Sequence, residues 1–490
     1  MSRGGKRAAA MRGSIRAYRV ASKGAAVSHP DPTGPLFKSR ARKIAPFVLP
    51  DHPGPSADAG ALEAYARDKA GFLSQYRLGF GALAEAEWAA AGLEAPDMDM
   101  LRAYRVGRVR DELARRGLDG ALLYDPLNVR YATDSTNMQL WCTHNAVRYA
   151  YVATDGPVTL WDFHHCEHLS GHSEVVDEVR HGIPWFYFEA GPRLEEFAAR
   201  WAAELAQVIR ASGSGKKPRI AADRMNPEGL RFLKAHGVSV VNGEAVLELA
   251  RSIKSVDEIR AMRRAIHACE AAMHVMEAQL QPGMSENDLW AILHAENIRC
   301  GGEWIETRLL SSGPRTNPWF QESSARIIEA GDLVAFDTDL IGPYGYCCDI
   351  SRTWLAGDGP AGNEQRDLYA MATEQIAANM AMLKPGISFR ELSETARSLP
   401  DDCLPNRYSV LFHGVGLCDE YPTVPYFDDW ESSGYDGELK PGMVVCVESY
   451  VGRHGGHEGV KLEDQVLITE TGHEQLSTYP PDERLSGPSL

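Results

Sequence analysis

Short apolar and β-branched runs alternate with turn residues through the last third of the chain. Three of these runs read GDLVAFD (331–337), MVVCVES (443–449) and VKLEDQVLI (460–468), and each is bounded by Gly, Pro or charged residues. Runs of this length and composition predict buried β-strands. Each run also contains a carboxylate, so the strands are expected to bring acidic side chains together.

The pattern is different earlier in the chain. Residues 58–99 are Ala-rich with apolar positions three and four apart, which predicts a helical lead-in. Residues 100–250 alternate strand-like runs such as RYAYVATDGPVTLWDF with helical ones such as PRLEEFAARWAAELAQVIRAS, an order typical of an α/β domain. A long amphipathic helix is expected to begin behind Ser255, a capping residue, and to open a second unit over 251–480.

Composition and charge add limits to this two-domain organisation. The net charge is −16 over 490 residues, but the first 47 residues hold 11 Lys and Arg and one Asp. We expect residues 1–57 to form a basic, disordered extension, with a targeting peptide as the alternative, and residues 481–490 to form a tail. The acidic body argues against a nucleic-acid partner, and no run approaches the roughly 20 apolar residues of a membrane span.

The nine cysteines include no CxxC pair and are odd in number. This usage favours free thiols in a reducing cytoplasm over a disulfide framework.

One histidine and five carboxylates lie in order along the predicted strands and turns of 251–480. Carboxylates gathered in one place repel one another unless divalent cations neutralise them, and oxygen ligands with one imidazole suit Mn, Fe, Co or Zn. We therefore predict a dinuclear metal site. Its expected ligands are Asp337, Asp339, Asp349, His413, Glu448 and Glu463. Asp337 and Asp339 are two residues apart, so on a continuous strand they would share one face.

These blocks, with the motifs RSIKSVDEI, HGVG and VKLEDQVLITETG, resemble the creatinase, prolidase and methionine aminopeptidase superfamily. The resemblance covers about residues 100–480. It implies a creatinase-like N-terminal α/β domain followed by a catalytic domain of the α+β pita-bread fold. The chain departs from the peptidases at four places. Asp339 precedes Asp349 by ten residues and Asp337 precedes it by twelve, where the peptidases have a spacing of eleven. Asp419 stands where they carry a second His, Ser449 follows Glu448 in place of Pro, and Lys461 replaces an Arg.

At these departures the chain resembles the DddP-type lyases of dimethylsulfoniopropionate (DMSP). Two further segments are similar to the same family, TDSTNMQLW and HAENIRCGGEWIETRLLSSGPRTNPWFQE. That family cleaves DMSP to dimethyl sulfide and acrylate, has a dinuclear metal site reported as iron, and forms homodimers. The resemblance implies a small-molecule substrate, the six ligands above, and Asp419 as the catalytic base. A solvated loop acid is the alternative reading of Asp419, and Glu420 is the fallback base.

A sulfonium cation favours aromatic faces, at roughly 0.5–2 kcal/mol per contact. Aromatic residues in or near the matching blocks are therefore candidates for substrate binding, with core packing as the alternative for each. They are Trp141, Trp319, Phe320, Tyr346 and Tyr408. Tyr408 is favoured, because it lies five residues before His413 and its hydroxyl could hold substrate or assist proton transfer. Cys347 and Cys348 flank Asp349, and we expect both to serve packing.

Two other functions stay open at this point. An Xaa-Pro dipeptidase or aminopeptidase would use the same metals to hydrolyse prolyl peptides, but it would be expected to carry a second imidazole where this chain has Asp419. A non-catalytic binding protein of the same fold would be expected to have lost part of the ligand set, which is complete here.

Overall fold

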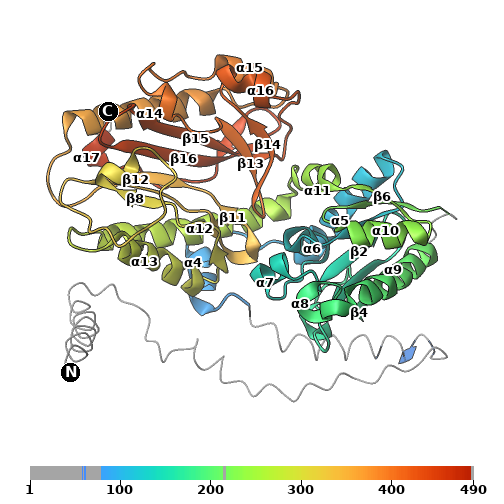
Figure 1. The fold of residues 1–490 in the computed structure, drawn as a ribbon. Helices are drawn as coiled ribbons and strands as arrows, with labels where there is room; N and C mark the ends of the chain where they lie inside the picture. Colours follow the sequence, from blue (N-terminus) through green and yellow to red (C-terminus); the bar gives the residue numbers. More distant parts are fainter. Residues whose placement is uncertain (1–57, 59, 62–63, 65–78, 213–216, 487–490) are drawn as a thin grey trace, which may run out of the picture.

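The structure, a computed structural model, describes residues 58, 60–61, 64, 79–212 and 217–486. It folds into two lobes that lie side by side (Figure 1). The predicted extension 1–57, most of the lead-in before residue 79, and residues 487–490 of the tail lie outside the described residues. Within the lead-in, α4 (Ala82–Ala90) is helical as predicted, and its Trp88 is buried.

The N-terminal lobe is built on a six-stranded mixed sheet in the order β4-β3-β2-β1-β5-β6. Its strands are β1 (Gly120–Leu123), β2 (Tyr149–Ala153), β3 (Val158–Asp162), β4 (Glu178–His181), β5 (Arg219–Ala222) and β6 (Ser239–Asn242). Its helices are α5 (Met98–Arg115), α6 (Pro126–Thr133), α7 (Gln139–His144), α8 (Tyr187–Ala190), α9 (Leu194–Ala211), α10 (Pro227–Ala235) and α11 (Glu244–Arg251). This is the predicted α/β order.

Both faces of this sheet are covered, which explains why β1 is apolar throughout. Ala121 and Leu123 belong to the core on the α5 side, whereas Leu122 packs in a second core that includes Trp201 of α9. Successive side chains of a strand point to opposite faces, so a strand buried on both faces shows no polar alternation.

The C-terminal lobe contains a five-stranded antiparallel sheet in the order β14-β13-β15-β16-β17 and two three-stranded sheets, β12-β9-β8 and β11-β10-β7. The strands are β7 (Trp304–Ile305), β8 (Leu310–Ser312), β9 (Leu333–Asp337), β10 (Leu340–Ile341), β11 (Cys347–Cys348), β12 (Ser351–Leu355), β13 (Phe412–Val415), β14 (Asp419–Val424), β15 (Val444–Gly452), β16 (Gly459–Ile468) and β17 (His473–Gln475). The helices are α12 (Val256–Gln279), α13 (Glu286–Arg299), α14 (Asn363–Ala381), α15 (Phe389–Thr395), α16 (Trp430–Ser433) and α17 (Glu483–Ser486).

Helices enclose these strands from two sides, with α12 and α13 on one side and α14 on the other (Figure 1). The long helix α12 begins where the sequence predicted, behind Ser255, whose hydroxyl accepts from the Glu258 amide in a capping box. The three apolar runs of the sequence become β9, β15 and β16. The fold class predicted from the sequence is confirmed.

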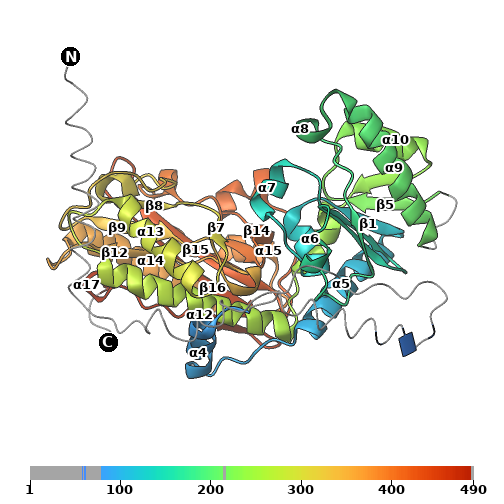
Figure 2. The same ribbon diagram turned by 90° about the horizontal axis from the view of Figure 1, so that it is seen from below.

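The two lobes are joined by buried contacts near the start of α12, which reaches toward α5 (Figure 2). Arg105 of α5 donates to Glu258 of α12 at 2.9 Å, and both side chains are almost fully buried. A buried pair of this kind depends on the geometry of both partners. It therefore fixes where α12, and the sheets packed on it, stand relative to the N-terminal lobe.

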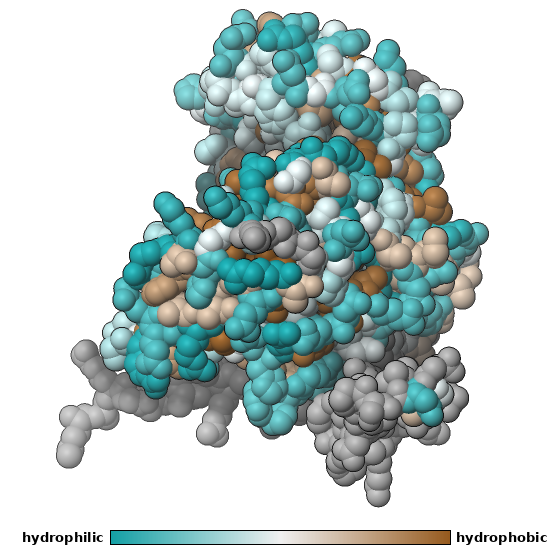
Figure 3. Space-filling model, turned by 90° about the vertical axis from the view of Figure 1, so that its right-hand side faces the viewer, coloured by the Kyte–Doolittle hydropathy of each residue, from teal (hydrophilic) through white to brown (hydrophobic). Residues whose placement is uncertain are grey.

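The surface carries no broad apolar region on the face seen in Figure 3, where hydrophobic residues are scattered among hydrophilic ones wherever the described residues are visible. Among the described residues, no helix combines the length and the apolar character needed to cross a membrane.

Candidate metal centre

The strands of the C-terminal lobe place the predicted ligands in one buried cluster. Glu448 of β15 stands directly opposite Glu463 of β16 in the strand register. His413 of β13 is paired with Cys446, two residues before Glu448 on β15. Because side chains two apart on a strand share a face, this register brings the imidazole and both glutamates to one side of the sheet.

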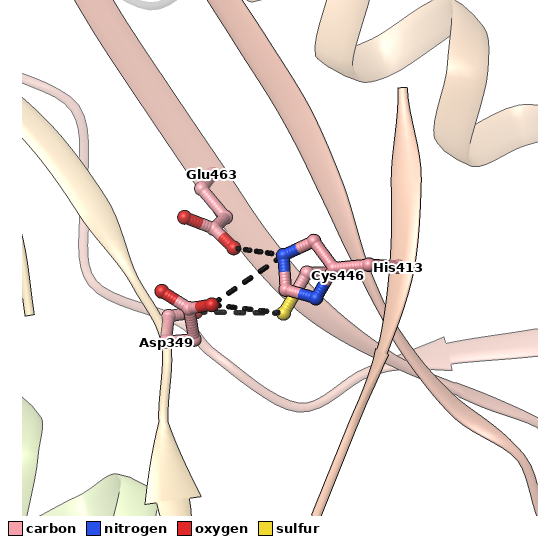
Figure 4. A group of neighbouring side chains, drawn as sticks. All are labelled: Asp349, His413, Cys446 and Glu463. Carbon is pink, nitrogen blue, oxygen red and sulfur yellow. Dashed lines mark hydrogen bonds and ion pairs between the residues drawn. The ribbon is translucent and has the colours of Figure 1, made fainter. Parts of the chain in front are cut away.

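Asp349 completes a group around the His413 imidazole (Figure 4). His413 Nε2 lies 3.4 Å from Asp349 Oδ2, 3.2 Å from Glu448 Oε1 and 3.4 Å from Glu463 Oε1. Ligand atoms of Asp349, His413, Cys446 and Glu463 all lie within 4.8 Å of one another.

A second group shares Asp349 with the first. Ligand oxygens of Asp337, Asp339 and Asp349 also lie within 4.8 Å of one another. Asp337 and Asp339 do not lie on one continuous strand, because β9 ends at Asp337 and Asp339 takes a left-handed conformation with φ of 36°. Thr307 donates its hydroxyl to Asp339 Oδ2 at 2.6 Å, which fixes the carboxylate after this turn.

Lys461 inserts a positive charge among the carboxylates. Its Nζ lies 2.6 Å from Glu448 Oε2, 3.0 Å from Glu463 Oε2 and 3.2 Å from Asp337 Oδ2, and the side chain is fully buried. It also donates to Ser351 Oγ at 2.7 Å. Burial acts to lower the pKa of Lys461, but the three carboxylates outweigh it and hold that pKa well above its usual range. The ammonium is therefore a permanent part of the cluster.

One ammonium does not balance the charge of five buried carboxylates. Burial raises the pKa of Asp349 well above its usual range, and the charges of Glu463 and Asp337 raise it further. Burial and Glu463 raise the pKa of Glu448 to about 7, against the opposing effect of Lys461. At neutral pH, Asp349 would hold a proton and Glu448 would be about half protonated unless further cations were bound among them.

Glu463 and His413 show the opposite balance, in which neighbouring charges favour the ionised form of each group. Burial acts to raise the pKa of Glu463, but Lys461 and His413 outweigh it and hold that pKa well below its usual range. Burial acts to lower the pKa of His413, but Asp419 and the two glutamates raise it well above its usual range.

The residues fit divalent metal ions. Asp337 Oδ1 and Asp349 Oδ1 are buried oxygens that have no hydrogen-bond partner among the described residues, and Glu463 Oε1 has an ion pair with His413 Nε2 but no hydrogen bond. Buried polar atoms in proteins are otherwise almost always paired, and a missing ion is a usual explanation for an exception. Hard carboxylate oxygens with a single imidazole are the donors that Mn, Fe, Co or Zn accept.

Asp419, the predicted base, lies next to this cluster and is itself exposed. Its Oδ1 lies 3.7 Å from His413 Nδ1, and its side chain is 59% exposed. Ligand atoms of Asp339, Cys347 and Asp419 lie within 4.8 Å of one another. Asp419 is thus next to two expected ligands and open to solvent.

The fallback base, Glu420, is not placed for that role. Neighbouring side chains of a strand point to opposite faces, so the Glu420 side chain faces away from that of Asp419. Its two oxygens accept from Arg251 at 3.1 Å and from Lys254 at 3.0 Å. These two cations outweigh its burial and lower the pKa of Glu420. A carboxylate held by two buried cations is a poor proton acceptor, so this prediction was wrong.

A carboxyl group that the sequence reasoning missed lies beside Asp419. Glu306 follows β7, and its backbone amide donates to the Asp339 carbonyl at 3.0 Å. Burial, followed by the charges of Asp419 and Asp125, raises the pKa of Glu306 to about 7, although part of the side chain is open to solvent. The only sequence signal was its presence in a block shared with the lyases.

The candidate aromatic residues divide into two groups. Lys461 Nζ lies 4.6 Å from the ring centroid of Tyr408 and 5.9 Å from that of Trp319, so both rings border the cluster. Phe320 stacks on Tyr408 with 5.3 Å between centroids. Burial and the charge of Glu448 raise the pKa of Tyr408 far above its usual range, so its phenol stays protonated.

Within this chain, Tyr346 and Trp141 lie apart from the rings that border the cluster. The Tyr346 hydroxyl donates to Glu258 at 3.0 Å and accepts from Arg105, inside the buried contact between the lobes. Trp141 lies on α7 of the other lobe and packs against Phe163, 5.5 Å between centroids. Sequence distance from a ligand did not reveal the direction in which either side chain points.

Sulfur atoms lie closer to the centre than the sequence suggested. Cys446 Sγ is 3.9 Å from Asp349 Oδ2, and Cys347 Sγ neighbours Asp339 and Asp419. Cys446 could have been found from its spacing of two from Glu448 on a strand. None of the nine cysteines is in a disulfide.

Two family models match the chain. Residues 105–253 match the creatinase/prolidase N-terminal domain, and residues 260–470 match metallopeptidase family M24. The two matches follow the two lobes of the structure.

Among curated proteins, the chain is similar to two dimethylsulfoniopropionate lyases DddP. It is 49% identical to the protein of Roseovarius nubinhibens over 412 residues, 83% of this chain and 92% of the relative. It is 47% identical to the protein of Roseobacter denitrificans over 422 residues, 85% of this chain and 94% of the relative. Among solved structures, an Xaa-Pro dipeptidase from Bacillus anthracis matches with a TM-score of 0.62 at 22% identity, over 78% of this chain and 99% of that chain. This last likeness shows the fold alone.

Proposed function

We propose, from the finding that this chain belongs to the DddP family of dimethylsulfoniopropionate lyases within the pita-bread superfamily, that it cleaves DMSP to dimethyl sulfide and acrylate. The chain is an enzyme, a carbon–sulfur lyase. The observation that carries the proposed mechanism is the position of Asp419, a carboxylate 3.7 Å from the His413 ring and outside the group of oxygens that surrounds His413 Nε2.

The cofactor in this proposal is a pair of divalent ions, iron by resemblance to the family, with Mn, Co and Zn also compatible with the donors. Asp337, Asp339, Asp349, His413, Glu448 and Glu463 would hold them, in the two adjacent groups that share Asp349. When bound, such ions supply Lewis-acid chemistry that draws charge from a substrate carboxylate.

Asp419 supplies the base. Its carboxylate takes the proton from the carbon next to the substrate carboxylate; the electrons of that C–H bond form the double bond of acrylate, and the C–S pair leaves with neutral dimethyl sulfide. Because the Asp419 side chain is open to solvent, it can then return the proton to water. Glu306, with its pKa of about 7, lies close enough to Asp419 for their charges to interact and would receive that proton readily.

The aromatic side chains beside Lys461 would hold the sulfonium group. Tyr408 and Phe320 stack at 5.3 Å, and Trp319 lies within the same region of the cluster. Cation–π contacts with such rings are worth about 0.5–2 kcal/mol each. Because the Tyr408 phenol stays protonated, its hydroxyl acts as a hydrogen-bond donor and not as a base.

The peptidase alternative has weaker support. The solved Xaa-Pro dipeptidase from Bacillus anthracis shares the fold with this chain at 22% identity, and a likeness at that level does not indicate a shared activity. The position at which a peptidase would carry a second imidazole is Asp419, and a carboxylate there suits proton abstraction. We further propose that the enzyme works as a homodimer in the cytoplasm, the first by family resemblance and the second from its unpaired cysteines.

The proposed reaction is tested by giving the metal-loaded enzyme DMSP and following both products by proton NMR, with a prolyl dipeptide in a parallel reaction. Equal amounts of dimethyl sulfide and acrylate, with the dipeptide intact, are expected. Hydrolysis of the dipeptide with no cleavage of DMSP would overturn the proposal.

A further inference from the structure

A second group of metal-binding side chains lies in the N-terminal lobe, outside the candidate metal centre. We call His164, His165, Glu167 and His181 the histidine cluster. Three of the four come from the motif DFHHCEH at 162–168, and His181 ends β4. The domain matched to these residues is the creatinase/prolidase N-terminal domain, not the metallopeptidase domain.

The sheet brings the members of the histidine cluster together. Strands β3 and β4 are parallel neighbours, and Asp162 at the end of β3 is paired with His181 at the end of β4. The chain leaves β3 at Asp162, beside the end of β4, and His164 follows two residues later. The ring centroids of His164 and His181 are 4.4 Å apart.

His165 joins the cluster through an unusual backbone conformation. Consecutive side chains of an extended segment would point in opposite directions, but His165 has φ of 64°, in the left-handed region. This conformation leaves its ring centroid 3.7 Å from that of His164 and 6.4 Å from that of His181. Strained residues of this kind concentrate at functional sites.

Glu167 adds a carboxylate to the three imidazoles. His181 Nε2 lies 3.0 Å from Glu167 Oε1. Burial acts to raise the pKa of Glu167, but hydrogen bonds and the nearby His181 and His165 outweigh it and lower that pKa. The carboxylate is thus ionised and in electrostatic contact with two of the three rings.

We propose that the histidine cluster is a second metal site, which binds one divalent transition ion of the class that prefers imidazole nitrogen, such as Zn²⁺. Three imidazoles and a carboxylate form a complete tetrahedral donor set for this ion. The three histidines are exposed, so the rings can rotate from their tilted and edge-to-face arrangement to direct nitrogen atoms at one point without repacking a core. Cys166, a softer donor, lies between His165 and Glu167 in the sequence and is not part of the proposed set.

Binding at this site would join β4, an edge strand of the sheet, to the turn that follows β3. An ion that binds the folded protein and not the unfolded chain raises stability by mass action. Zn²⁺ should therefore raise the unfolding temperature through the histidine cluster, and this effect is separate from catalysis.

The test is calorimetric titration of Zn²⁺ into the full-length enzyme whose catalytic centre has already been loaded with metal. The parent is compared with a His164→Ala/His181→Ala double variant, and a His236→Ala variant serves as a matched control from the same lobe. Any exchange at the catalytic centre would be equal in all three proteins.

We expect the parent and His236→Ala to bind one equivalent of Zn²⁺ more than the double variant and to gain unfolding temperature with Zn²⁺, while the double variant gains none. Turnover of DMSP should be equal in all three. Equal Zn²⁺ stoichiometry and equal thermal shifts in parent and double variant would overturn the proposal and leave the cluster as surface ion pairing only.

Discussion

Lys461 Nζ lies 2.6 Å from Glu448 Oε2, and the other oxygen of the same carboxylate lies 3.2 Å from His413 Nε2. Glu463 divides its oxygens in the same way between these two partners. The cluster therefore contains a fixed internal cation in addition to any metal, and that cation positions the two glutamates.

Replacing Lys461 by Met should destabilise the metal-free protein by about 3–5 kcal/mol, because removing one partner leaves buried carboxylates without their cation. Chemical denaturation of the metal-free protein measures this loss. Lys440→Met, at an exposed lysine of the same lobe, is the control and should change stability little. Equal stability of Lys461→Met and parent would show that the ammonium does not hold the cluster together.

Asp349 is shared by the two ligand groups, so Asp349→Ala should reduce metal binding at both. We expect bound metal, measured by elemental analysis after dialysis, to fall below one equivalent per chain. Asp358→Ala, at an exposed loop residue, should retain the parent's content. Retention of the full content by Asp349→Ala would refute the shared-ligand arrangement.

The metal-free protein should lose stability as pH rises. The pKa of Glu448 is about 7 in the folded protein and about 4.5 as a free side chain, so between these values the folded state holds more protons than the unfolded chain. By thermodynamic linkage, the raised pKa of Glu448 adds to the free energy of unfolding. This added stability is fully present below about pH 4.5 and is lost as pH approaches 7.

Thermal unfolding between pH 5 and 7.5 measures this dependence, which Glu448→Gln should flatten because the amide does not titrate. The metal-loaded protein should lack this pH dependence, because bound cations keep the Glu448 carboxylate ionised. An equal slope in parent and Glu448→Gln would contradict the assignment.

The aromatic face of Tyr408 should matter more for substrate affinity than its hydroxyl. We expect Tyr408→Ala to raise KM for DMSP by about 2- to 30-fold, the equivalent of one cation–π contact, and Tyr408→Phe to raise it less. Tyr346→Phe should leave KM unchanged, because that ring lies between the lobes beside Arg105. A larger effect at Tyr346 than at Tyr408 would reverse the assignment.

The sequence predicted the parts of the site that depend on strand order and failed where side-chain direction decides. Asp349, His413, Glu448 and Glu463 were found because each lies in or beside a strand with a recognisable motif. Glu420 was misjudged, because one step along β14 turned it toward Arg251 and Lys254.

Tertiary contacts that no local pattern reports account for the other differences. Tyr346 is adjacent to β11 in sequence, yet its hydroxyl is bonded to residues more than 80 positions away. Glu306 acquires its raised pKa first from burial and then from the charges of Asp419 and of Asp125 in the other lobe. Lys461 was recognised as a replacement for Arg, but its contacts with three carboxylates depend on the register of β15 and β16.

Asp419→Asn tests whether a base outside the ligand set cleaves DMSP at the metal centre. Headspace dimethyl sulfide and bound metal are measured together for parent, Asp419→Asn and the exposed control Asp428→Asn. We expect Asp419→Asn to keep the parent's metal content and to lose at least 100-fold in dimethyl sulfide release, about the lower limit for removing a general base, while Asp428→Asn matches the parent. Undiminished release from metal-loaded Asp419→Asn would show that Asp419 is not the base.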